Sequence, residues 1–135
     1  MVAHGRLLAG EVGELAGVSG NTIGQWARWG YIRSSQSEGD PRVYSVEDVA
    51  EAAIVADLLA RGVRHADIRS TVARLRGGRY GAWPLSEARL AVTSDEPRPR
   101  IVLRENGTAW ALGARGWQQL AVLPELDEVR LRFRH

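Results

Sequence analysis

The stretch that decides the fold is residues 7–44, LLAGEVGELAGVSGNTIGQWARWGYIRSSQSEGDPRVY. It predicts two short helices, at residues 9–16 and 20–29, joined by a tight turn. A polar segment follows and predicts a β-hairpin at residues 31–44, which we call the wing. Two helices in this order, followed by a wing, are the plan of a winged helix-turn-helix.

Small residues and one cap define the turn between the helices. Gly13 leaves room for a close helix crossing, and Gly17 can adopt the positive φ angle that turns the chain. Ser19 is a favourable N-cap for the second helix. Ile23 and Trp26 are three residues apart and are expected to bury one face of that helix against the first. Taken alone, this pattern is equally consistent with any two-helix corner.

The outward face of the second helix is predicted to carry polar side chains suited to base edges and phosphates. These are Asn21, Thr22, Gln25 and Arg28. In the wing, a strong turn signal at residues 38–41 precedes Arg42-Val43-Tyr44. Strand alternation there predicts Arg42 and Tyr44 on one face, with Val43 on the other.

The order EV…LAGVS..TI..WARWGYI…G.PR.YS.EDV resembles the MerR-type winged helix, including its shorter excisionase-like relatives, and the resemblance covers residues 7–76. It implies that helix 20–29 enters the major groove of double-stranded DNA. It also implies that Arg42 and Tyr44, together with Arg33, hold phosphates.

The sequence departs from the family pattern at two places. Relatives usually carry alanine where this chain has Gly13, which is still small enough for a helix crossing. The wing contains Glu38 and Asp40, which weaken the positive potential expected there.

Beyond the wing, two longer helices are predicted. Ser45 and Asp48 form a capping-box variant that starts one of them, and Arg61-Gly62 ends it. The next helix is expected at residues 65–75. Arginines dominate residues 61–79, which suits a phosphate contact or, equally, a solvated helix face. Residues 76–81, RGGRYG, break any helix, so the long dimerisation helix of full-length relatives is not expected.

The remaining chain predicts a small α+β module. Asn106-Gly107 between alternating strands is a strong hairpin signal. The predicted elements are a helix at residues 86–90, strands at 100–104 and 108–112, a helix at 117–122 and a strand at 129–134 that carries Arg130, Arg132 and Arg134 on one face.

Composition excludes several classes of protein. The 135 residues contain no cysteine, which removes disulfides, thiolate metal sites and cysteine nucleophiles. All 18 basic residues are arginine, against 16 acids, which we attribute to coding bias. The three histidines show no metal-ligand spacing, and no catalytic constellation is evident, so we expect no metal, no cofactor and no enzyme activity. No apolar run reaches the roughly 20 residues of a membrane span, and a cytoplasmic location is expected.

We therefore predict an α+β protein with a DNA-binding domain at residues 1–78 and a dimerisation or interaction module at residues 79–135. Its predicted function is that of a sequence-specific transcriptional regulator that binds DNA as a homodimer. Two alternatives concern the second half. It faintly resembles helix-turn-helix antitoxins, which implies a PIN-type ribonuclease toxin as partner. Its three tryptophans could instead line an aromatic ligand pocket, although tryptophans are more often core residues.

Overall fold

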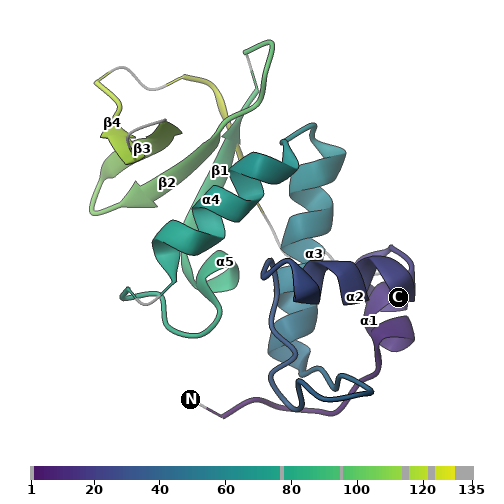
Figure 1. The fold of residues 1–135 in the computed structure, drawn as a ribbon. Coiled ribbons are helices and arrows are strands. Elements are labelled where there is room, and N and C mark those ends of the chain that lie inside the picture. Colours follow the sequence, from purple (N-terminus) through teal and green to yellow (C-terminus); the bar gives the residue numbers. More distant parts are fainter. Residues whose placement is uncertain (1, 77, 95, 114–115, 122–123, 130–135) are drawn as a thin grey trace. The chain divides into compact units, whose positions relative to one another are not determined.

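The computed structural model describes residues 2–76, 78–94, 96–113, 116–121 and 124–129. Helices form the first part of the chain and a five-stranded antiparallel sheet forms the second, which confirms the α+β class (Figure 1). The chain divides into two compact units, one ending at Ala56 and the other running from Asp57 to Arg130. The domain division between residues 78 and 79 stays a prediction.

The four longer helices confirm the sequence-based expectations to within a residue or two. The helices are α1 Ala9–Ala16, α2 Gly20–Arg28, α3 Val46–Ala60, α4 His65–Leu75 and the short α5 Pro84–Glu87. Local signals set their ends, because caps and glycines act within one turn of the helix. Ser45 and Asp48 form the predicted reciprocal cap of α3: Asp48 Oδ2 accepts from Ser45 N at 2.8 Å, and Ser45 Oγ accepts from Asp48 N at 3.1 Å.

The α1–α2 turn has the predicted geometry. Gly17 caps α1 with φ 82°, and Ser19 Oγ accepts from the backbone N–H of Thr22 at 3.1 Å. A Cβ atom on Gly13 would lie 2.5 Å from the carbonyl oxygen of Val18, so only glycine fits this crossing without a shift. Ile23 and Trp26 are buried, as expected for the inner face of α2.

The wing differs from the predicted β-hairpin. No named strand forms there among the described residues, and a single isolated bridge pairs Ser37 with Val43. The segment between Arg33 and Pro41 is serine-rich and lacks alternating apolar residues, so nothing stabilises a longer ladder. A second isolated bridge pairs Tyr44 with Leu7 instead, which ties the end of the wing to the N-terminal segment.

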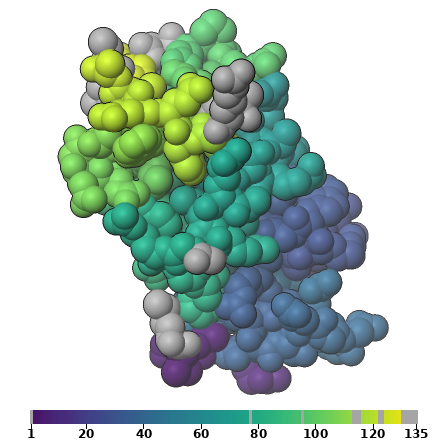
Figure 2. Space-filling view, turned by 60° about the vertical axis from the view of Figure 1, so that its left-hand side comes forward, coloured from purple at the N-terminus to yellow at the C-terminus, as the bar shows by residue number. Residues whose placement is uncertain are grey.

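The second unit contains the sheet, whose strand order is β4-β3-β2-β1-β5. The strands are β1 Arg89–Thr93, β2 Ile101–Glu105, β3 Thr108–Gly113, β4 Gly116–Gln119 and β5 Leu126–Glu128. The predicted β2–β3 hairpin is confirmed, and both turn residues, Asn106 and Gly107, have positive φ. In the space-filling view, the yellow segment around β4 lies against the green strand β3 (Figure 2).

Two helices predicted in this unit are wrong. Residues 86–90 were expected to be helical, but α5 ends at Glu87, and Arg89 and Leu90 begin strand β1. Residues 117–122 were also expected to be helical, but Trp117 lies in β4, which pairs with β3. Both segments are short, so pairing with a distant strand outweighs a weak local helix preference. The strand predicted at residues 129–134 lies almost entirely outside the described residues; Val129 follows β5.

Candidate nucleic-acid interface

Helix α2 presents one polar face to solvent. Asn21, Gln25 and Arg28 are exposed and follow one another at intervals of four and three residues, which places them on the same side of a helix. The opposite side is anchored by Ile23 and Trp26, with exposed fractions of 0% and 2%. The anchored side fixes the rotation of α2, so its three polar side chains project together.

Thr22 belongs to the same helix but is engaged locally. Its hydroxyl lies 2.9 Å from Ser19 Oγ, and its backbone N–H donates to the same atom. The side chain is half-buried. Thr22 therefore contributes to the N-cap of α2, and its methyl group is the part best placed to meet another molecule.

The two arginines of the wing, Arg33 and Arg42, are half-buried rather than fully exposed. Arg42 is half-buried, and its Nη1 donates to Ser34 Oγ at 3.3 Å. Ser34 itself is 2% exposed, so the contact fixes the guanidinium to a buried anchor. Arg33 is also half-buried. An arginine guanidinium can bind a phosphate through two hydrogen bonds, as the predicted contact requires.

Tyr44 lies in the core, where sequence alternation did not place it. Its exposed fraction is 0%, and its hydroxyl is buried without a hydrogen-bond partner among the described residues. Burial raises the pKa of Tyr44, while the charges of Arg42 and Arg28 oppose this shift and Asp48 adds to it. Arg28 of α2 and Arg42 of the wing thus both act to lower the pKa of the same buried hydroxyl. We assign Tyr44 to packing and leave it out of the phosphate-contacting set.

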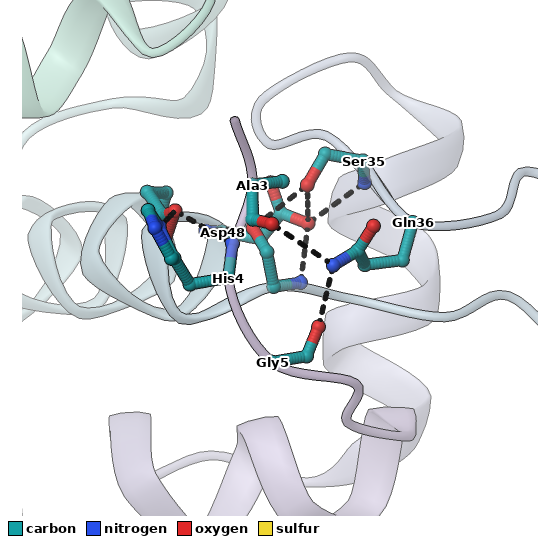
Figure 3. A network of polar contacts seen from close by, with 8 residues as sticks. Ala3, His4, Gly5, Ser35, Gln36 and Asp48 are labelled. Carbon is teal, nitrogen blue, oxygen red and sulfur yellow. Dashed lines mark hydrogen bonds and ion pairs between the residues drawn. The ribbon is translucent and has the colours of Figure 1, made fainter. Parts of the chain in front are cut away.

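The sequence analysis missed how firmly the base of the wing is tied to α3. Asp48 is buried and accepts from Ser35 N and Ser35 Oγ, each at 2.8 Å, in addition to its capping bond (Figure 3). The signal was present, because the serine pair at residues 34–35 is unusual in a segment expected to be a strand. A carboxylate that accepts several hydrogen bonds within a buried site holds the backbone around it in one conformation.

Hydrogen bonds tie the N-terminal segment to the wing and to α3. Gln36 Nε2 donates to the carbonyl oxygen of Gly5 at 2.7 Å, and His4 Nδ1 lies 2.7 Å from Glu47 Oε1 (Figure 3). Burial acts to raise the pKa of Glu47, but the hydrogen bonds from His4 outweigh it and hold that pKa below its ordinary value. The segment supports the wing from the side of α3.

Charges elsewhere on the chain are partly compensated. In the arginine-rich segment 61–79, Arg61 pairs with Asp57, Arg64 with Asp67 and Arg79 with Glu105. Arg69, Arg74 and Arg76 remain exposed. The segment is therefore less basic than its sequence indicates.

Other kinds of site lack support in the described part of the chain. No group of three or more histidine, aspartate or glutamate side chains there could hold a metal ion. Nor does any helix within the described ranges have the length and apolar character needed to cross a membrane.

Comparison with known proteins bears on the first half of the chain. The family model described as MerR HTH family regulatory protein matches residues 8–75, close to the limits of the resemblance drawn from the sequence. Comparison with curated proteins found no match, and comparison with solved structures found none either. The toxin partner suggested for the second half therefore stays a prediction. The chain belongs to the MerR family of helix-turn-helix regulatory proteins.

Proposed function

We propose that this regulator binds a specific double-stranded DNA sequence by placing α2 in the major groove. The exposed face of Asn21, Gln25 and Arg28 carries the proposal. Glutamine and asparagine amides can pair with adenine, and arginine can pair with guanine, so each side chain can discriminate bases. Thr22, whose hydroxyl is committed to the cap, is assigned a methyl contact with thymine.

The wing is assigned to the DNA backbone. Arg42 is anchored on Ser34, and Arg33 lies nearby in the chain, so each can meet a phosphate without losing much side-chain entropy. Backbone contacts of this kind set the register of the recognition helix but carry no sequence information. The exposed acids Glu38 and Asp40 at the wing tip are expected to keep that tip away from the phosphates.

The regulator is proposed to act as a homodimer. Helix α2 has only nine residues, and specific complexes usually bury upward of roughly 1,000 Å² of protein surface. A single copy offers a small interface, whereas two copies can occupy two half-sites.

A base-contact test uses Gln25→Ala. The preferred sequence is first selected from a library of random duplexes, and affinities for it and for a scrambled duplex are then measured by fluorescence anisotropy. Because Gln25 is read as a base contact, its loss should reduce discrimination by about 1–3 kcal/mol while leaving binding to scrambled DNA nearly unchanged. Equal losses on both duplexes would remove Gln25 from base recognition.

A phosphate-contact test uses Arg42→Ala. Affinity should fall for every sequence, and the slope of log K against log salt should become shallower by about 1, because one counterion fewer is released. Arg98→Ala is the matched control, since Arg98 is an exposed arginine in a loop of the other unit. An unchanged slope in Arg42→Ala, or the same change in Arg98→Ala, would exclude the wing contact.

A further inference from the structure

A hollow of about 360 Å³ opens beside the β2–β3 hairpin. Arg89 and Arg104 line it together with the hairpin residues Asn106 and Thr108. Ala109 and Leu120 add a small apolar wall. Sites for small molecules in proteins occupy about 300–1,000 Å³, and this hollow lies in that range. Its lining is mostly polar.

The two arginines face each other across neighbouring strands. Arg89 of β1 is the register partner of Arg104 of β2, and Arg104 is in turn the partner of Ala109 of β3. Register partners in an antiparallel sheet project from the same face, so this row places two guanidinium groups beside one alanine. Like charges directly opposite each other destabilise a sheet unless an anion compensates them.

Of these two arginines, only Arg104 forms an ion pair within the described residues. Arg104 Nη2 lies 3.1 Å from Glu128 Oε1, whereas Arg104 Nε is buried without a hydrogen-bond partner among the described residues. Arg89 is exposed, and no ion pair joins it to the described part of the chain.

The other carboxylate near the hollow is already engaged. Glu105 accepts from Tyr80 Oη at 2.6 Å and pairs with Arg79. Glu105 also lines the hollow, so its charge is present there, but Arg79 compensates it. The charge of Arg89 is therefore not compensated by an ion pair at the hollow within the described residues.

We propose that this hollow binds a small organic monocarboxylate. The carboxylate would accept from the guanidinium of Arg89 in the planar arrangement that arginine favours, and the neighbouring Arg104 would add positive potential. Glu128 already shows that a carboxylate fits against Arg104. A single unmatched positive charge favours a monoanion over a phosphate dianion, and the wall of Ala109 and Leu120 leaves room for a carbon skeleton. The proposal concerns the second unit alone and does not depend on DNA binding.

The test is a titration of the full-length ¹⁵N-labelled protein, followed by NMR. Benzoate is the probe, benzamide is its neutral analogue, and inorganic phosphate is the competing anion. Benzoate should cause a saturable shift of the Arg89 Nε–H resonance and of the backbone amides of Asn106 and Gly107. Benzamide and phosphate should shift them much less at equal ionic strength.

Variants separate this site from general charge effects. Arg89→Gln should weaken benzoate binding about tenfold, because a charge-assisted hydrogen bond is lost while an exposed position tolerates the change. Arg69→Gln, an exposed arginine on α4, is the matched control and should bind benzoate as the unmodified protein does. The proposal is overturned by no saturable shift with benzoate, by equal binding of benzamide, by tighter binding of phosphate, or by unchanged affinity in Arg89→Gln.

Discussion

Gly13 is the tightest point of the helix-turn-helix. A Cβ atom there would approach the Val18 carbonyl oxygen to 2.5 Å and the Gly20 nitrogen to 3.1 Å, and both contacts are with backbone. Because even a methyl group does not fit at Gly13 without a shift of backbone atoms, α1 and α2 approach each other closely at this turn. The absence of a side chain at one residue thus sets the distance between two helices.

Gly13→Ala is therefore expected to destabilise this protein, even though alanine favours helices. The free energy of unfolding should fall by about 1–3 kcal/mol, the range typical of overpacking, because backbone atoms must move. Urea denaturation followed by circular dichroism measures it. Gly10→Ala is the control: no atom lies within 4 Å of its added Cβ, so this change should stabilise by about 0.5–1 kcal/mol. Equal stability of the two variants would show that the turn relaxes freely.

At the scale of elements, local signals explain what could be predicted from the sequence. Gly17 ends α1 and Ser19 begins α2, and the Ser45–Asp48 cap starts α3 in the same way. The Asn106-Gly107 turn similarly requires no knowledge of the rest of the chain. Each of these features is a hydrogen bond or backbone angle formed between close neighbours in the sequence.

Features that depend on distant residues could not be predicted. Trp117 was assigned to a helix because its local spacing allows one, but its place in β4 depends on pairing with Leu112 of β3. Tyr44 was placed on the surface by alternation, yet its backbone pairs with Leu7 and its ring lies in the core. On α2, by contrast, the exposed residues could be predicted because helical periodicity already separates the two faces.

The half-buried Tyr80 joins the loop after α4 to the β2–β3 hairpin, because its hydroxyl donates to Glu105. Burial and the hydrogen bond to Glu105 raise the pKa of Tyr80 to about 12. A tyrosine in the unfolded chain titrates near 10, so the stability that Tyr80 contributes is complete below about pH 10 and is lost as the pH rises towards 12.

Tyr80→Phe tests this connection between the two elements. Near neutral pH, the variant should be less stable by about 1 kcal/mol, the usual net value of one hydrogen bond. Between about pH 10 and 12, the unmodified protein should lose more unfolding free energy than the variant, so the two curves converge. Urea denaturation at a series of pH values, followed by tryptophan fluorescence, gives both curves. Parallel curves over that interval would mean that Tyr80 titrates normally in the folded protein.

At the scale of the whole molecule, the ending of α4 limits how two copies can associate. Helix α4 stops at Leu75, and Arg76 is already extended, with φ −68° and ψ 136°. The chain then continues through a loop and α5 into the sheet, so α4 does not extend into a coiled coil. If the protein binds DNA as a dimer, another surface of the full-length chain must join the copies, or the DNA itself must bring them together.

The stoichiometry on DNA decides whether two copies act together. We expect two chains on a duplex carrying the full selected sequence, with half-sites about 10 base pairs apart or a multiple of that spacing, because both recognition helices must meet the same side of the duplex. Sedimentation velocity with fluorescently labelled duplex, at saturating protein, counts the chains directly. A duplex carrying a single half-site is the control and should bind one chain with lower affinity. Insertion of about five base pairs between the half-sites should weaken binding of the pair, since it turns them to opposite sides of the helix. One chain on the full duplex at saturation would contradict the homodimer, and α2 and the wing would then have to supply all the specificity in a single copy.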